Sequence, residues 1–465
     1  MKSLWIRRLI VVFAGVGIWF SPIPWELSVE AWHLFALFFS AILGVLLNAF
    51  PILLSALFAM VIGVFTGTLT PKTAFSGFSQ SFMLLILAAF LVAKAVIKSG
   101  LGKRLALLLI RRFGKSTLGL GYCIFVTDAL LGPAIPSNLA RSGILYPIIH
   151  ALALDTGSFP GDASRKRSGS FLMLCGMVSL TVSSAMWLTA MGGNPIAAGI
   201  AGRFGVDISF GNWFLAASLP SLAGLILLPR ILYRIFPPEV RQTPTAQAAA
   251  AKDLQIMGPM SRPELITASV FLGMIVLWGF AAFLKINLAI VALSGLAILI
   301  LTKVYRLEDF RAEGGDALET YIWFSILYMI SSQLNELGFM STLGIQISSL
   351  LGGLNWMLVY LFLLLLYVLI HYFFVSQTAH LLALYAVFLE VGSSAGVPII
   401  LLAYMLAFAT NFFSSITPQG SSGNVIFVGS GYLEIKEVFR YGGIVTLINL
   451  LLYALATPWV LWVVG

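Results

Sequence analysis

The chain has 465 residues, of which 60% are hydrophobic and only 10% are charged. Near-continuous apolar runs recur along its whole length, which excludes soluble globular and disordered proteins and predicts an all-α polytopic membrane protein. The runs are continuous rather than alternating, which argues against a membrane β-barrel. The formal net charge of +9 is explained by basic cytoplasmic loops, so we expect a lipid bilayer and no nucleic acid as its surroundings.

The apolar runs predict about 11 transmembrane helices. In chain order we expect them at roughly 9–20, 31–49, 51–69, 81–98, 169–202, 212–234, 264–284, 286–302, 319–338, 398–430 and 441–463. Two further apolar stretches, about 117–154 and 353–393, are too interrupted to form single helices. We expect each of them to enter and leave the membrane on the same side, as a re-entrant helical hairpin.

The basic residues test this topology, because cytoplasmic loops are enriched in lysine and arginine. If the N-terminus is cytoplasmic, only Lys72, Arg203 and Lys285 of the 27 basic residues fall outside the cell, while Lys94 and Arg141 lie within the membrane. The C-terminus is then external. The N-terminal segment does not resemble a transit peptide, so we expect a multi-pass protein of a bacterial inner membrane.

The topology contains two repeats of opposite orientation. Residues 1–30 hold the first helix and an external loop, 31–234 form the first repeat, 235–262 a polar, alanine-rich cytoplasmic linker, and 263–465 the second repeat. Each repeat has three spans, a hairpin and two more spans. Inverted repeats with interrupted helices are typical of secondary transporters that bind their substrate near the membrane midplane.

The two hairpins carry related polar tips. Setting SNLARSGILY (137–146) over SQTAHLLALY (376–385) gives four identities in ten positions at an offset of 239 residues. A helix that starts inside the membrane exposes N–H groups that favour an anion, and hydroxyl and amide groups add donors for a carboxylate. The predicted substrate-binding residues of the tips are Ser137, Asn138, Ser376, Gln377 and Thr378. A single tip could instead bond only to neighbouring helices, but two matched tips favour a binding site.

A second helix break follows each hairpin. The sequences LTAMGGNPIAAG and SSITPQGSSGNVIF place glycine and proline in the middle of a long span, where they unwind a helix. Threonine and asparagine at such a break either bond the freed backbone or face a ligand. We expect Thr417 and Pro418 to contribute to substrate binding, with a packing kink as the alternative.

Arg141 and His380 occupy equivalent positions, four residues after the first serine of each tip. An arginine at membrane depth costs ~2.5–3.5 kcal/mol or more, so it requires a partner. Both residues are candidates for binding an anionic substrate. The alternatives are that Arg141 pairs with a buried carboxylate such as Asp128 or with backbone carbonyls, and that His380 is a neutral core histidine.

Other chemistries lack support in the sequence. FGKST (113–117) resembles a phosphate-binding loop, but Leu109 stands where that motif needs glycine. The four histidines and two cysteines show no metal-ligand spacing, so we expect no cofactor or metal beyond a possible sodium ion. A membrane enzyme would need paired carboxylates or a metal motif, and an ion channel would need a continuous polar pore rather than two opposed hairpins.

The tips SNLAR and SQTAH, the break TPQGSSGN and the YGGI segment after GSGYLEIKEVFR resemble the divalent anion:sodium symporter (DASS) family. The resemblance spans the whole chain and is strongest to citrate/succinate antiporters and 2-oxoglutarate/malate translocators. It implies that substrate carboxylates bind between the tips, at Ser137 and Asn138 in the first and Ser376 and Thr378 in the second. It also implies a homodimer that works by an elevator motion.

In this family sodium sites lie beside the tips and breaks, at positions that correspond here to Gly193, Asn194, Gly420 and Asn424. The chain departs from the family pattern in two places, because Leu139 replaces a threonine and Gln377 an asparagine. We therefore expect a secondary transporter, not an enzyme, that exchanges C4–C5 dicarboxylates such as malate, succinate, fumarate and 2-oxoglutarate. The alternative is a Na⁺-coupled symporter of citrate, dicarboxylate or sulfate.

Overall fold

The computed structural model describes residues 2–351 and 353–465. Within these residues the chain is helical, and its extended pairing is limited to one isolated bridge between Ser116 and Gln242. Eight of the described helices are long and apolar enough to cross a membrane. The prediction of an all-α polytopic membrane protein is confirmed.

The first half of the chain contains the helices α1 (Lys2–Trp19), α2 (Val29–Leu46), α3 (Ile52–Phe65), α4 (Pro71–Ala74), α5 (Ser81–Ser99), α6 (Leu101–Phe113), α7 (Thr117–Leu131), α8 (Asn138–Asp155), α9 (Gly169–Met186), α10 (Gly193–Arg203) and α11 (Phe210–Ile235). Short 3₁₀ turns lie at Ser76–Ser79 (η1), Gly132–Ala134 (η2) and Ala163–Lys166 (η3).

The second half follows with α12 (Pro244–Met257), α13 (Arg262–Gly279), α14 (Ala281–Leu284), α15 (Leu288–Leu301), α16 (Leu307–Glu313), α17 (Gly315–Glu336), α18 (Phe339–Leu350), α19 (Trp356–Ile370), α20 (Gln377–Ser394), α21 (Ile399–Phe412), α22 (Asn424–Gly429), α23 (Ile435–Leu455) and α24 (Thr457–Val464). Its 3₁₀ turns are His371–Phe373 (η4) and Phe413–Ser415 (η5).

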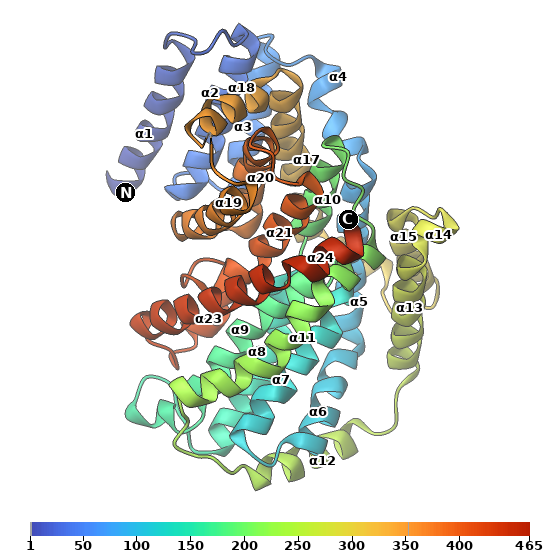
Figure 1. The fold of residues 1–465 in the computed structure, drawn as a ribbon. Helices are drawn as coiled ribbons and strands as arrows, with labels where there is room; N and C mark the ends of the chain where they lie inside the picture. Colours follow the sequence, from blue (N-terminus) through green and yellow to red (C-terminus); the bar gives the residue numbers. More distant parts are fainter. Residues whose placement is uncertain (1, 352) are drawn as a thin grey trace.

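Helix α9 lies at the centre of the molecule. All of its residues are buried, and it packs against α7, α8, α11 and α21. In Figure 1, α1–α3 and α17–α20 lie toward the top, α6–α8 and α12 toward the bottom, and α23 and α24 cross between them. Elements from both halves of the chain therefore surround α9, which brings the two sets of helix breaks together.

The two interrupted stretches are helical hairpins, as predicted. The first consists of α7, η2 and α8, and the second of α19, η4 and α20. The two spans that follow are also broken, because α9 ends before α10 begins and α21 ends before α22 begins.

The structure adds helices that the hydropathy pattern did not predict, and one of them lies in the linker 235–262. Helix α12 forms there because its run of alanines has high helix propensity, and it packs on α6. Helices α6 and α18, which lead into the two hairpins, contain 13 and 12 residues and are too short to register as separate membrane spans.

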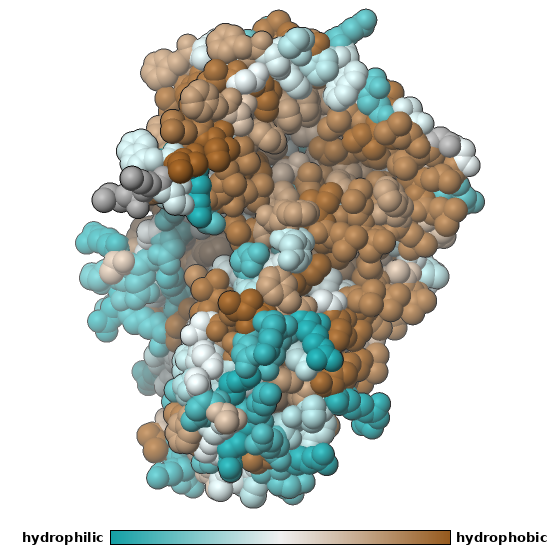
Figure 2. Space-filling model, turned by 90° about the vertical axis from the view of Figure 1, so that its left-hand side faces the viewer, coloured by the Kyte–Doolittle hydropathy of each residue, from teal (hydrophilic) through white to brown (hydrophobic). Residues whose placement is uncertain are grey.

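The surface is largely apolar. Figure 2 shows a broad hydrophobic area with hydrophilic residues gathered mainly toward the lower end and one side. Large apolar side chains such as Phe65 and Phe283 are 87% and 85% exposed. Such a surface suits contact with lipid chains rather than water.

Candidate functional site

Each hairpin tip is the start of a helix capped by serine. The Ser137 Oγ accepts a hydrogen bond from the Ala140 N–H at 3.2 Å, and the Ser376 Oγ accepts one from the Ala379 N–H at 3.3 Å. Both serines have extended backbone geometry, so α8 and α20 begin in the same way. The first N–H groups of each helix have no acceptor within the helix, and the helix dipole favours negative charge there.

The two tips touch each other. The Asn138 Nδ2 donates to the Gln377 Oε1 at 2.8 Å, and these residues are separated by the same 239 positions that relate the two motifs in the sequence. The Asn138 Nδ2 also donates to the Ser421 Oγ at 3.1 Å, and the Gln377 Nε2 donates to the Thr410 carbonyl at 2.8 Å. The two amides therefore join the tips to each other, to the second break at Ser421 and to α21 at Thr410.

Each break packs against the tip of the opposite half. A Cβ added to Gly193, in the first break, would lie 3.3 Å from the Thr378 Oγ1 in the second tip. A Cβ added to Gly423, in the second break, would lie 2.6 Å from the Ser142 Oγ and 3.0 Å from the Asn138 carbonyl oxygen beside the first tip. The two halves are thus interlocked around the tips.

An asparagine holds each break in shape. The Asn194 Nδ2 donates to the carbonyls of Ser184 and Trp187, at 2.9 and 3.1 Å. The Asn424 Nδ2 donates in the same register to the carbonyls of Ser414 and Thr417, at 2.8 and 3.1 Å. Each amide thus replaces hydrogen bonds that the unwound helix has lost.

A cavity of about 890 Å³ begins at the tips and runs along α8 to α12. Five of the predicted binding residues line it, namely Ser137, Asn138, Ser376, Gln377 and Thr378. Its volume is within the usual range for small-molecule sites, and its surface is mostly apolar around a few polar groups. That combination is what a small anion with a hydrocarbon backbone requires.

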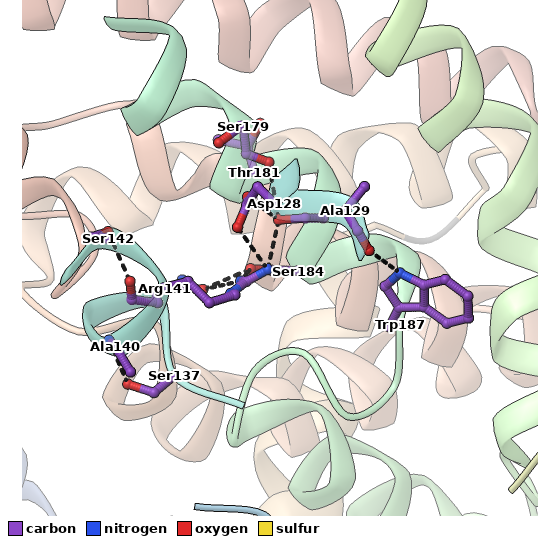
Figure 3. A network of polar contacts seen from close by, with 12 residues as sticks. Asp128, Ala129, Ser137, Ala140, Arg141, Ser142, Ser179, Thr181, Ser184 and Trp187 are labelled. Carbon is purple, nitrogen blue, oxygen red and sulfur yellow. Dashed lines mark hydrogen bonds and ion pairs between the residues drawn. The ribbon is translucent and has the colours of Figure 1, made fainter. Parts of the chain in front are cut away.

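Arg141 lies behind the first tip rather than in the cavity (Figure 3). Its side chain is fully buried, and its Nη1 lies 3.3 Å from the Asp128 Oδ1. The Nη1 also donates to Ser183 Oγ at 2.7 Å, and the Nη2 donates to Asn138 Oδ1 and Ser184 Oγ, both at 2.5 Å. Arg141 therefore pairs with the buried carboxylate of Asp128, as one interpretation of the sequence expected. Its guanidinium also fixes the orientation of the Asn138 amide.

His380 is also buried behind its tip, in a different environment. Its ring lies against the rings of Tyr367, Phe374, Phe413 and His371, at centroid distances of 4.3, 4.9, 4.8 and 5.2 Å. Neither ring nitrogen has a hydrogen-bond partner among the described residues. The neighbouring His371 contacts the second break, since its Nε2 lies 2.8 Å from the Gly420 carbonyl oxygen.

The remaining predicted residues lie near the tips without lining the cavity. These are Arg141, His380, Thr417, Pro418, Gly193, Asn194, Gly420 and Asn424. Among them, Arg141 bonds the first tip, and Asn194 and Asn424 bond the two breaks.

Sequence reasoning missed part of the cavity wall. Met191, Gly192 and Ser422 line it from the two breaks, and Trp323 and Phe324 line it from α17. The breaks carry a sequence signal in their glycines. The two aromatic residues carry none, because an aromatic side chain in a membrane span is equally expected against lipid or in the core.

The sequence is similar to known transporters over nearly its full length. The family model for the sodium:sulfate symporter transmembrane region matches residues 2–465. YflS of Bacillus subtilis (strain 168), provisionally named a malate transporter, is 39% identical over 450 residues, which cover 96% of this chain and 94% of that protein. The L-tartrate/succinate antiporter of Shigella dysenteriae serotype 1 is 32% identical over 472 residues, covering 96% of each.

The fold is also similar to that of MtrF from Neisseria gonorrhoeae, described as an antimetabolite efflux pump. The TM-score is 0.61 at 13% sequence identity, with 99% of this chain and 94% of that chain covered, so this likeness concerns the fold alone. The family assignment rests instead on the full-length sequence match. The chain belongs to the sodium:sulfate symporter family, which is the DASS family, and it is a multi-pass membrane transporter rather than an enzyme.

Proposed function

We propose that this protein exchanges C4–C5 dicarboxylates, such as malate, succinate, fumarate and 2-oxoglutarate, across a bacterial inner membrane. The observation that carries the proposal is the contact between the two hairpin tips, with Asn138 and Gln377 hydrogen-bonded at 2.8 Å beside a cavity of about 890 Å³. The names of the relatives, which refer to malate and to tartrate and succinate, agree with it.

The chemistry of the tips suits a molecule with a carboxylate at each end. The hydroxyl groups of Ser137 and Ser376 accept bonds from their own helices, which leaves each hydroxyl hydrogen free to be donated to a carboxylate oxygen. Thr378 adds a third hydroxyl, whose nearest polar contact is the Met191 sulfur at 3.9 Å. One carboxylate would bind at each helix start, and the apolar wall, including the half-exposed Leu139, would contact the carbon chain.

Exchange is supported by the way the first tip is stabilised. The Asn138 Oδ1 accepts hydrogen bonds from the Arg141 Nη2 and the Ser184 Oγ. The tip is therefore ordered by groups of the protein itself. Such a carrier requires no cation to accompany the substrate, so one dicarboxylate can return as another leaves.

The transport cycle proposed is an elevator motion in a homodimer, with the N-terminus cytoplasmic and the C-terminus external. The interlocked tips and breaks would move as one unit. Helices α6 and α18 would connect this moving unit to the remaining helices. Each of them follows a glycine with positive φ at which the chain turns, Gly100 with φ +80° and Gly338 with φ +77°. In that orientation the cavity, which ends at α12 in the linker, faces the cytoplasm.

A counterflow assay tests the proposal. Proteoliposomes are loaded with unlabelled malate, and labelled succinate or 2-oxoglutarate is added outside with and without Na⁺. We expect rapid uptake that requires internal dicarboxylate and is independent of Na⁺. Absence of counterflow with every di- and tricarboxylate tried would refute the substrate class.

One observation favours the alternative, a Na⁺-coupled symporter. At the second break the side-chain oxygens of Ser414, Thr417 and Asn424 are buried and have no hydrogen-bond partner among the described residues. Hydroxyl and amide oxygens of this kind are ligands for hard cations. Uptake that requires Na⁺ and proceeds into empty vesicles would replace exchange by symport while keeping the substrate class.

A further inference from the structure

A second hollow, of about 460 Å³, lies apart from the substrate cavity and has no lining residue in common with it. Its walls come from the segment that enters α9, the segment that leaves α11 and the first turns of α23. None of the residues assigned to the substrate site belongs to it.

The hollow is positively charged. Lys166, Lys436 and Arg440 contribute to its lining, and Glu437 is its acidic residue. The Glu437 carboxylate is already bound by Arg165 from outside the hollow, at 2.8 and 3.0 Å, and so does not neutralise the lining cations. Lys436 has a surface partner, whereas the ion pairs of the described residues include neither Lys166 nor Arg440. Two cations of the lining therefore lack an acidic partner.

The walls are fixed by contacts of their own. The Glu239 and Val240 N–H groups donate to the carbonyls of Lys166 and Arg167, at 3.2 and 2.8 Å, so the chain leaving α11 is bonded to the chain entering α9. The rings of Phe236 and Tyr441 pack against each other in a tilted arrangement, with their centroids 4.6 Å apart. Contacts within the protein therefore hold the walls of the hollow in place, which lowers the cost of binding a ligand.

The position of the hollow narrows the class of ligand. It lies where three apolar, membrane-length helices begin or end, α9, α11 and α23. The lining combines cations with an apolar surface from Phe236 and Tyr441, and the adjacent Ile435 side chain is 63% exposed. Basic pockets between membrane helices at this depth suit a phosphate that is attached to an acyl chain.

We propose that this hollow binds the phosphate of an anionic phospholipid headgroup, with Lys166 and Arg440 as its principal ligands. Both are long, exposed side chains that can move onto a phosphate. Arg440 can present two N–H groups to it, and Lys166 supplies a point charge. The acyl chains would continue along the exposed apolar surface beside Ile435.

Native mass spectrometry and thermal unfolding of the full-length protein in detergent test this proposal. The probes are phosphatidylglycerol, phosphatidylcholine and inorganic phosphate. We expect phosphatidylglycerol to be retained and to raise the melting temperature, and the other two probes to have little effect. The double substitution Lys166→Gln/Arg440→Gln should weaken phosphatidylglycerol binding by about 30-fold.

The matched control is Arg111→Gln/Arg112→Gln, which removes the same charge from exposed positions at the end of α6, outside the hollow. It should retain phosphatidylglycerol binding. Equal loss in both double variants would overturn the proposal, because it would indicate attraction to overall charge. Unchanged binding in the Lys166/Arg440 variant would overturn it as well. If inorganic phosphate raised the melting temperature as much as phosphatidylglycerol does, the proposal would be overturned, because the hollow would then bind free phosphate rather than a lipid headgroup.

Discussion

The two hairpin tips begin their helices in the same way but are supported by opposite means. Behind the first tip a charged network of Arg141, Asp128 and two serines bonds the Asn138 amide. Behind the second tip an uncharged aromatic enclosure surrounds His380. The two hairpins therefore share the geometry of their helix starts, while the residues packed behind the tips differ in charge.

The difference also concerns unused hydrogen-bonding capacity. At the second tip and break, His371 Nδ1, both nitrogens of His380, and the oxygens of Ser414, Thr417 and Asn424 lack partners among the described residues. At the first tip the Asn138 amide is bonded at both of its ends, and behind it only Asp128 Oδ1 and Arg141 Nε lack a hydrogen-bond partner among the described residues, in side chains that form an ion pair with each other. The second half is therefore the place where a cation or a proton would have most effect, and the first half the place where substitutions should be most costly.

The largest effect should follow from breaking the buried ion pair. Arg141→Met leaves Asp128 charged and unpaired at a fully buried position, and we expect the free energy of unfolding to fall by about 3–5 kcal/mol. Chemical unfolding in detergent measures it. The double variant Arg141→Met/Asp128→Asn should recover part of the loss, and a double variant no more stable than Arg141→Met would contradict the pairing.

A smaller loss is expected where a break packs on the opposite tip. Gly423→Ala forces a Cβ to within 2.6 Å of the Ser142 Oγ, so we expect a loss of about 1–3 kcal/mol in stability together with slower transport. Gly273→Ala is the control, because a Cβ there meets nothing within 4 Å. Equal behaviour of the two variants in unfolding and uptake assays would show that the close contact is unimportant.

The caps should behave alike in the two halves. Ser137→Ala and Ser376→Ala each remove a helix cap worth about 1 kcal/mol, and each also removes a hydroxyl donor that faces the cavity. We expect about a tenfold rise in the external dicarboxylate concentration that half-saturates exchange, in both variants. A rise in the half-saturating concentration in only one of the two variants would contradict this prediction, because it would mean that one tip alone binds substrate.

The smallest effect on stability is expected behind the second tip. His380→Leu replaces a buried imidazole that lacks a hydrogen-bond partner with an apolar side chain inside an aromatic enclosure, so the free energy of unfolding should change by less than about 1 kcal/mol. Chemical unfolding of His380→Leu and Arg141→Met in the same detergent measures the two changes in the free energy of unfolding. A loss as large as that of Arg141→Met would mean that both halves rely equally on the residue behind the tip.

The sequence predicted the architecture because its signals are local or periodic. Apolar runs predicted the positions of the spans. The offset of 239 residues between the two tip motifs paired Asn138 with Gln377, and these two side chains are hydrogen-bonded in the structure. It did not predict α12, because a polar linker lacks the apolar run that marks a span, even though its alanines have high helix propensity.

The sequence also could not decide the partner of Arg141. Asp128 lies on the other arm of the same hairpin, and the two serines that complete the network lie on α9. Their proximity depends on how three helices pack. The aromatic wall of the cavity was missed for the same reason, since the direction in which Phe324 points is set by tertiary packing.

If both tips contact one substrate, bound substrate should protect a single cysteine at either tip from labelling. Ser137→Cys and Ser376→Cys place thiols on the cavity, while the native Cys123 and Cys175 are buried at 3% and 0% exposure. Ala249→Cys, at the far end of the same cavity, is the control. We expect malate to slow thiol labelling at positions 137 and 376 alike and to leave labelling at position 249 unchanged. Protection at neither tip, or at one tip only, would contradict it.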